Sequence, residues 1–126
     1  MNIAYSTDEN YAVHAYISLN SLLDSNKNEP EITCWLICNR LLEKTKDHFS
    51  DLVDLYNEKL HKRKIVFLDF VEYEEHVKDA TPCGSLSTYG RIFLPEMCCV
   101  DRMLYIDCDT LVVGRLTIFI MRNCPI

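Results

Sequence analysis

Glycine is scarce in this chain of 126 residues, which excludes the common glycine-rich loops that bind phosphate. Only Gly84, Gly90 and Gly114 are present, and their spacing matches neither a G-x-G-x-x-G motif nor a Walker loop. A phosphate group bound by this chain would have to be held by side chains or by a metal ion, because a cradle of glycine amides is missing.

Positive charge and long apolar runs are also lacking. The chain has 13 Lys and Arg against 19 Asp and Glu, a net charge of −6, which argues against a nucleic-acid partner. The densest basic cluster, Lys62-Arg63-Lys64, is predicted to be solvated residues between two elements.

No apolar stretch reaches about 18 residues and the first residues form no secretory signal, which predicts a cytoplasmic protein without a transmembrane segment.

The cysteines are numerous, but their spacing excludes the usual zinc sites. None of the seven belongs to a C-x-x-C pair. Their odd number and the adjacent Cys98 and Cys99 fit a disulfide framework poorly. We expect free thiols that act as small hydrophobic side chains in a reducing cytosol.

Apolar and polar segments alternate along the chain in the manner of an α/β protein. With 48% hydrophobic and 25% charged residues, the composition is that of one globular domain, residues 1–126. Periodicity predicts strands at residues 2–5, 31–38, 64–69 and 103–106, and helices at 10–23, 41–60 and 85–94, the last closed by Pro95. Residues 24–30 and 81–84 are predicted loops, and 70–79 is ambiguous. The order implies a mostly parallel sheet with helices on both faces, whose ligands bind beyond the carboxyl ends of its strands.

Two polar clusters follow predicted strands and should share one edge of the sheet. One is residues 6–11, and the other is Asp107-Cys108-Asp109. In an extended chain the two carboxylates point to one side, with Cα atoms roughly 6.6 Å apart. They would suit a hard cation such as Mg²⁺, Mn²⁺ or Ca²⁺, while Cys108 points the other way and packs. About one D-x-D motif is expected by chance in such a chain. The support for a metal site therefore comes from the position of this motif at the end of a strand.

The sequence allows two interpretations of Tyr11. At a helix start beside Asp8 and Asn10, its ring could stack on a nucleotide base while the polar pair reads the edge of that base. Alternatively, Tyr11 belongs to the apolar stripe of the helix and packs in the core.

Several motifs together resemble the N-terminal half of a family 8 glycosyltransferase, an enzyme of the GT-A fold that uses a nucleotide-sugar donor. They are STDENY at residues 6–11, SLNSLL at 18–23, STYGRIFLP at 87–95 and DRMLYIDCDT at 101–110. The resemblance covers residues 1–116. It implies a Rossmann-like half-domain that binds a nucleotide sugar.

The resemblance also implies roles for individual residues. Tyr11 would stack on the uracil of a UDP-sugar, Arg91 would reach the phosphates or sugar, and Asp107 and Asp109 would bind Mn²⁺, or alternatively Mg²⁺. The full nucleotide-sugar site would comprise Ser6, Thr7, Asp8, Asn10, Tyr11, Arg91, Asp107, Cys108 and Asp109. The implied reaction transfers glucose or galactose, with retention of configuration, to a glycan or glycolipid such as lipopolysaccharide.

The chain departs from the family pattern after its D-x-D motif. The third metal ligand of the family is a histidine well beyond that motif, but the histidines here, at 14, 48, 61 and 76, all precede Asp109. Residues 115–126 form an atypical apolar tail. The sequence therefore predicts a truncated portion of an enzyme that is peripheral to the membrane in its full-length form. Alone, this portion is expected to bind nucleotide weakly and transfer sugar poorly.

Two other classes of protein remain open from the sequence. A non-catalytic module that binds a nucleotide sugar or a partner, a remnant of such a transferase, would carry the same motifs. A metal-dependent phosphatase of the haloacid-dehalogenase type also places two aspartates after an apolar strand. The motif of that class requires Thr or Val four residues after the first aspartate, and this chain has Leu111 at that position.

Overall fold

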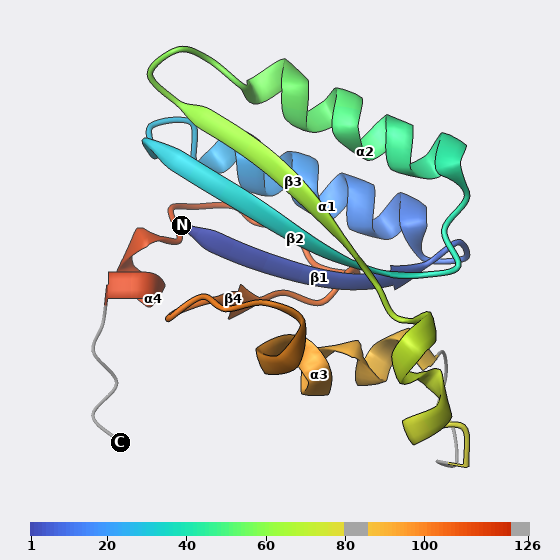
Figure 1. Ribbon diagram of the computed structural model, residues 1–126. Coiled ribbons are helices and arrows are strands. Elements are labelled where there is room, and N and C mark those ends of the chain that lie inside the picture. Colours follow the sequence, from blue (N-terminus) through green and yellow to red (C-terminus); the bar gives the residue numbers. More distant parts are fainter. Residues whose placement is uncertain (80–85, 122–126) are drawn as a thin grey trace.

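The computed structural model describes residues 1–79 and 86–121, which form a parallel sheet flanked by helices (Figure 1). The sheet has the order β3-β2-β1-β4, and each neighbouring pair is parallel. Its strands are β1 (Asn2–Asp8), β2 (Glu31–Asn39), β3 (Lys62–Asp69) and β4 (Leu104–Tyr105). The predicted α/β class with a mostly parallel sheet is confirmed.

One face of the sheet is covered by α1 (Ala12–Ser25) and α2 (Glu43–Tyr56). Alternate residues of each strand point to this face, because successive side chains of a strand project to opposite sides. The helices bury apolar residues at helical spacing against them, as the periodicity predicted. The resulting core contains Ile3, Tyr5, Leu19, Leu22, Leu23, Ile32, Cys34, Leu36, Phe49, Leu52 and Val53.

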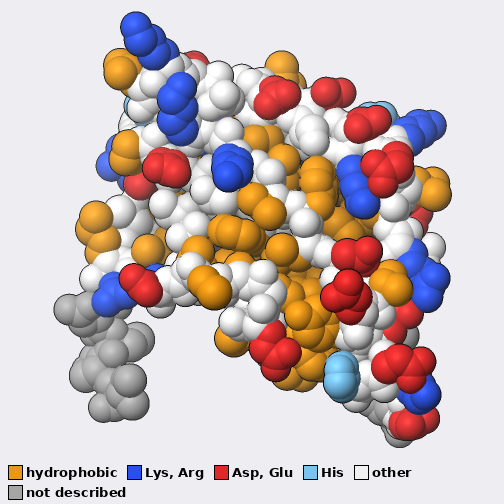
Figure 2. All heavy atoms as spheres, in the orientation of Figure 1, with side chains coloured by type: hydrophobic (Ala, Val, Ile, Leu, Met, Phe, Trp, Pro, Cys, Tyr) orange, Lys and Arg blue, Asp and Glu red, His pale blue; other side chains and the backbone are white. Residues whose placement is uncertain are grey.

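The opposite face carries a smaller core. Ala4 and Ile37 pack there with Phe70, Val77 and Leu94. These contacts involve the 3-10 helices η1 (Val71–His76) and η2 (Leu86–Tyr89) and the helix α3 (Gly90–Met97). Figure 2 shows hydrophobic side chains gathered over the strands of the sheet. Trp35 and Leu68, both half-buried, pack against this smaller core. Helices thus lie on both faces, as predicted, but they cover the second one less completely.

The prediction that Lys62-Arg63-Lys64 is a solvated connection is right only in that Lys62 and Lys64 are exposed. It is wrong about the connection and about Arg63. These residues begin β3, and Arg63 is only 5% exposed. Its guanidinium donates hydrogen bonds to the backbone carbonyl oxygens of Asn26, Lys27, Glu29 and Lys62 at 2.8 to 3.1 Å. Because these carbonyls replace the water around the two terminal nitrogens, a charged side chain is tolerated here, although the buried Nε of Arg63 has no hydrogen-bond partner among the described residues. Burial also lowers the pKa of Arg63.

Other element boundaries differ from the prediction in ways that local physics explains. Strand β1 runs to Asp8, because its pairing with β2 continues to the partners Asp8 and Asn39. Helix α2 ends at Tyr56, so that Leu60 lies outside it and is 78% exposed. Pro95 lies inside α3 and does not close it, since the helix continues and the Cys98 amide still donates to the Leu94 carbonyl at 3.1 Å.

After β4, the chain passes to the α1 side of the sheet and reaches α4 (Thr117–Met121) (Figure 1). The predicted loop at residues 81–84 lies outside the described residues. Five cysteines fall within the described residues, at 34, 38, 98, 99 and 108, and all are free, as expected. Across residues 1–79 and 86–121, no helix is long and apolar enough to cross a membrane.

Candidate functional site

The candidate site lies where β1 and β4 end side by side. Ile3 and Ala4 pair in register with Leu104 and Tyr105, and the Ile106 amide donates to the Ala4 carbonyl at 2.9 Å. Strands β2 and β3 extend the sheet on one side of β1, whereas β4 lies on the other. In sheets of this kind, ligands bind beyond the carboxyl ends of the strands at such a reversal. The two polar clusters predicted to share an edge therefore do so.

Negative charges from both clusters act on the Cys108 thiol. Burial raises the pKa of the Cys108 thiol to about 11, the neighbouring Thr7 side chain opposes this rise, and the charges of Asp107, Asp109 and Asp8 add to it. The coupling links Asp8, at the end of β1, to the two carboxylates that follow β4.

The D-x-D segment is a turn, so the extended geometry predicted for it is wrong. Strand β4 ends at Tyr105, and Cys108 and Asp109 form the turn. The Thr110 hydroxyl stabilises this turn by donating to the Asp107 carbonyl oxygen at 2.8 Å. The Cys108 thiol donates to the Ser6 carbonyl oxygen at 2.9 Å and packs against the larger core, as predicted. The turn is therefore held from within, while the side chains of Asp107 and Asp109 are exposed.

Arg91 lies beside the first of these carboxylates. Its Nη1 atom is 3.9 Å from Asp107 Oδ1, and its guanidinium carbon is 5.9 Å from the centre of the Tyr105 ring. Arg91 therefore lies near both Tyr105 and Asp107. Burial raises the pKa of Tyr105 to about 12, the negative charges of Cys108 and Asp107 raise it too, and the positive charge of Arg91 opposes them.

Gly90 allows Arg91 to take this position. A Cβ atom added at Gly90 would lie 2.6 Å from Ser6 Oγ and 3.0 Å from Ile37 Cγ2, both closer than packing normally permits. The start of α3 can therefore lie directly against β1 and β2 only because residue 90 has no side chain. This role of Gly90 was not predicted from the sequence, although its place directly before Arg91 was an available signal.

The segment after β1 presents Tyr11 to solvent. The Tyr11 amide donates to Asp8 Oδ1 at 3.0 Å, which fixes the turn into α1. The side chain of Tyr11 is 49% exposed, and its ring centre is 5.6 Å from that of His14 at an angle of 47°. The interpretation of Tyr11 as a core tyrosine is therefore wrong. The neighbouring Asn10 is also exposed.

Ser6 and Thr7 have a different environment, because both are buried. The Ser6 hydroxyl donates to the Ser87 carbonyl oxygen, and the Thr7 hydroxyl donates to the Asp8 carbonyl oxygen at 3.0 Å. Both hydroxyl groups thus brace the edge of the sheet from inside. Their predicted contact with a ligand stays a prediction.

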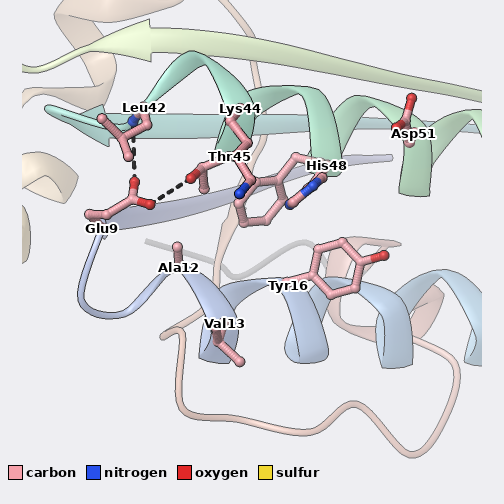
Figure 3. Close-up of a pocket in the computed structure, with 10 residues that line it drawn as sticks. Glu9, Ala12, Val13, Tyr16, Leu42, Lys44, Thr45, His48 and Asp51 are labelled. Carbon is pink, nitrogen blue, oxygen red and sulfur yellow. Dashed lines mark hydrogen bonds between the residues drawn. The ribbon is translucent and has the colours of Figure 1, made fainter.

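Glu9 is a residue that the sequence analysis missed. Its carboxylate accepts hydrogen bonds from the Leu42 amide at 3.2 Å and from the Thr45 hydroxyl at 2.6 Å (Figure 3). Helix α2 has Leu42 at its N-cap, which offers no capping group of its own. Glu9 supplies that cap from the segment after β1. The missing cap before residue 43 was the signal that could have identified a partner elsewhere.

A hollow of about 630 Å³ lies beside Glu9, between the first turns of α1 and α2 (Figure 3). Ala12, Val13 and Tyr16 line it from α1, and Thr45 and His48 line it from α2. The residues that line it do not include Asp107, Asp109 or Arg91. A second hollow of about 520 Å³ follows the outer edge of β4 and includes Asp107.

The donor set at the end of β4 suits a hard divalent cation in part. Asp107 and Asp109 supply carboxylate oxygens at the surface, and the Asp107 side chain is 62% exposed. Residues 1–79 and 86–121 contain no group of three His, Cys, Asp or Glu side chains placed to hold a metal ion. The described residues thus offer two oxygen ligands, and further donors would have to come from a ligand or from other residues.

Comparison with known proteins gives a consistent result. A model of the family described as Glycosyl transferase family 8 matches residues 2–123. A curated protein of Haemophilus influenzae named "Putative glycosyltransferase" is 27% identical over 113 residues, which are 88% of this chain and 32% of that protein. The chain therefore spans about a third of the length of this relative.

Two solved structures have the same fold. The galactosyltransferase LgtC, in complex with donor and acceptor sugar analogues, matches with a TM-score of 0.75 and 25% identity over 94% of this chain and 41% of LgtC. The apo form of the glycosyltransferase GlyE from Streptococcus pneumoniae TIGR4 matches with a TM-score of 0.66 and 20% identity over 97% of this chain and 26% of GlyE. The likeness to GlyE concerns the fold alone.

Proposed function

This chain belongs to glycosyl transferase family 8, and we propose that it forms the nucleotide-sugar-binding part of a hexosyltransferase that uses a UDP-sugar donor. One observation carries the proposal. The end of β1, with Asp8 and the exposed Tyr11, lies beside the turn that bears Asp107 and Asp109, with Arg91 next to it. A base, a diphosphate and a metal ion would each meet suitable side chains along this edge.

The nucleoside would bind at the segment after β1. Tyr11 presents an exposed ring at the start of α1, and aromatic rings bind nucleobases by stacking. Asp8 and Asn10 would read the edge of the uracil. The Asp8 carboxylate also fixes the Tyr11 backbone, so that ring and polar groups keep a defined relation.

The diphosphate would bind between Arg91 and the D-x-D turn. Asp107 and Asp109 would hold Mn²⁺, or Mg²⁺, together with oxygens of the diphosphate. When bound, such an ion offsets the negative charge that develops on the departing UDP as the bond to the sugar breaks. Arg91, 3.9 Å from Asp107, would place a second positive charge at the same leaving group.

The transferred sugar would be glucose or galactose, with retention of its configuration. The acceptor would be a glycan or glycolipid such as lipopolysaccharide, and the protein would act in the cytoplasm, at the membrane surface in its full-length form. Support for galactose comes from the likeness to LgtC, a galactosyltransferase of which this chain spans 41%. Membership of the glycosyltransferase family replaces the phosphatase interpretation.

A panel of nucleotides tests this proposal. In calorimetric titrations of the purified chain with Mn²⁺ present, UDP should bind more tightly than ADP or GDP. Tyr11→Leu should weaken that binding, whereas Tyr56→Phe, at the far end of α2 and outside the site, should leave it unchanged. Equal binding of all three nucleotides, or of none, would contradict the proposed donor class.

A further inference from the structure

Three hydroxyl groups from three segments form a continuous chain of hydrogen bonds to the D-x-D turn. The Tyr5 hydroxyl oxygen lies 3.0 Å from Ser18 Oγ, and Ser18 Oγ lies 3.1 Å from Thr110 Oγ1. The Thr110 hydroxyl then donates to the Asp107 carbonyl oxygen at 2.8 Å. Tyr5 belongs to β1 and Ser18 to α1, and Thr110 follows the turn. We call these three residues the hydroxyl chain.

The direction of donation along the hydroxyl chain follows from counting protons. A hydroxyl group has one proton to donate, and Thr110 donates its proton to the Asp107 carbonyl. Ser18 must therefore donate to Thr110, and Tyr5 must donate to Ser18. The hydrogen bonds thus run in one direction, from Tyr5 through Ser18 to Thr110. The last one reaches the backbone carbonyl of Asp107, whose side chain is a predicted metal ligand.

Burial restricts the hydroxyl groups of Tyr5 and Ser18 to these hydrogen bonds. Tyr5 and Ser18 are both completely buried, so neither hydroxyl can turn to water as an alternative partner. A buried hydroxyl without a partner is costly, which holds the two side chains in the bonded arrangement. Burial also raises the pKa of Tyr5 well above its ordinary value, so the phenol keeps the proton that it donates.

Other serines of α1 hold the same segment further along. The Val112 amide donates to Ser21 Oγ at 2.9 Å, and the Ser25 hydroxyl donates to the Val112 carbonyl oxygen at 2.8 Å. These bonds fix the chain beyond the carboxylates, whereas the hydroxyl chain ends at Asp107. Helix α1 therefore holds this segment at two places. Ser18 contacts the turn through Thr110, and Ser21 and Ser25 contact the backbone of Val112 beyond it.

We infer that Thr110 is a positioning residue for the carboxylates of Asp107 and Asp109, held in place by Ser18 with Tyr5 behind it. This role rests on the proposed function, since the carboxylates need a fixed position only if they hold a metal ion and a diphosphate. The side chains of Ser18 and Tyr5 touch no ligand in this account. Their effect is to keep the turn in one arrangement before the ligand arrives, which lowers the cost of binding.

Substitutions at Thr110 test the inference with little change of shape. Thr110→Val removes the hydroxyl and keeps the volume, Thr110→Ser keeps the hydroxyl, and Ser25→Ala breaks the downstream anchor as a matched control. For each protein, UDP affinity is measured by calorimetry with Mn²⁺ and with EDTA, and urea unfolding gives the stability. Thr110→Val breaks both hydrogen bonds of the Thr110 hydroxyl and should lose roughly fivefold in the affinity measured with Mn²⁺, but not in EDTA. Thr110→Ser and Ser25→Ala should stay within about twofold of the unsubstituted protein.

The outcomes separate this inference from the proposed function. If the unsubstituted chain shows no Mn²⁺-dependent binding of UDP, the proposed function fails. Amide hydrogen exchange of residues 107–111 then still decides the structural role, because Thr110→Val should speed exchange there and Ser25→Ala should not. Equal affinity losses with Mn²⁺ and EDTA, or unchanged exchange in Thr110→Val, would overturn the inference.

Discussion

The guanidinium of Arg91 lies 3.9 Å from the carboxylate of Asp107, although the two residues are 16 positions apart along the chain. Both side chains are more than half exposed, at 51% and 62%. An ion pair this long and this exposed contributes little to stability, on the order of 0–1 kcal/mol. The pair therefore matters as a juxtaposition of opposite charges at the predicted diphosphate site, more than as a structural bond.

Removing the positive charge of Arg91 should weaken UDP binding without unfolding the protein. Arg91→Ala is expected to lose about tenfold in affinity in the presence of Mn²⁺, because a charge-assisted contact to phosphate is lost. Arg91→Lys should lie in between, since it keeps the charge and loses the planar fork. Lys64→Ala, on the strand at the other edge of the sheet, is the matched control. Equal losses for Arg91→Ala and Lys64→Ala in calorimetry would contradict this role.

The cap that Glu9 supplies to α2 predicts a loss of stability. Glu9→Ala removes the acceptor for the Leu42 amide and the Thr45 hydroxyl, and should lower the free energy of unfolding by about 1 kcal/mol. Glu43→Ala removes an exposed carboxylate from the first turn of the same helix and should cost less than about 0.5 kcal/mol. Urea titrations followed by circular dichroism compare the two. A smaller effect for Glu9→Ala than for Glu43→Ala would refute the capping role.

The buried guanidinium of Arg63 predicts a larger loss. Arg63→Met leaves backbone carbonyls of residues 26, 27, 29 and 62 without their donor, and should destabilise the fold by about 2–5 kcal/mol. Lys64→Met, at the exposed neighbouring position of β3, should have an effect within about 0.5 kcal/mol. Chemical denaturation of both variants is the measurement. Similar midpoints for the two would show that the carbonyl contacts contribute nothing.

The buried thiols of Cys34 and Cys38 predict a loss of stability in alkali. Burial raises both pKa values from 9.0 to about 12 in the folded protein. Above pH 9 the unfolded chain releases these protons first, so the free energy of unfolding should fall between about pH 9 and pH 12. Below pH 9 the contribution is complete. The fall is at most about 1.4 kcal/mol per pH unit for each thiol.

A pair of variants isolates this effect from other groups that titrate in alkali. The double variant Cys34→Ala and Cys38→Ala should lose stability less steeply between pH 9 and pH 10.5 than the unsubstituted protein. Cys99→Ala, at an exposed thiol, should follow the unsubstituted protein. Parallel slopes for all three proteins would show that burial of these thiols does not couple folding to pH.

Much of the fold was predictable because its signals are local. The apolar run of β2 and the stripe of α1 are patterns that a parallel sheet and a covering helix require. The edge shared by Asp8 and Asp107 followed from the general behaviour of parallel strands. What the pattern missed depends on partners distant in sequence. Arg63 looks like a solvated cation until the carbonyls that surround it are known, and Glu9 looks like a loop residue until Leu42 lies beside it.

The D-x-D turn shows the same limit within the site. Extended geometry was the natural expectation after an apolar strand, but the Thr110 hydroxyl closes a turn over Asp107, and Ser18 anchors it from another element. Neither contact has a local signature in the sequence. Gly90, in contrast, has a signal in the sequence. The chain has only three glycines, and this one directly precedes Arg91, whose position depends on the absence of a side chain at residue 90.

Calorimetric titration of UDP in the presence of Mn²⁺ is the most direct test of the central claim, that Asp107 and Asp109 hold a metal ion with the diphosphate of the donor. The account predicts that the chain binds UDP with Mn²⁺ and that Asp109→Ala abolishes the metal-dependent part of this binding. Asp101→Ala, an exposed carboxylate just before β4, should bind like the unsubstituted protein. If UDP binding with Mn²⁺ survives Asp109→Ala undiminished, the assignment of the metal site is wrong.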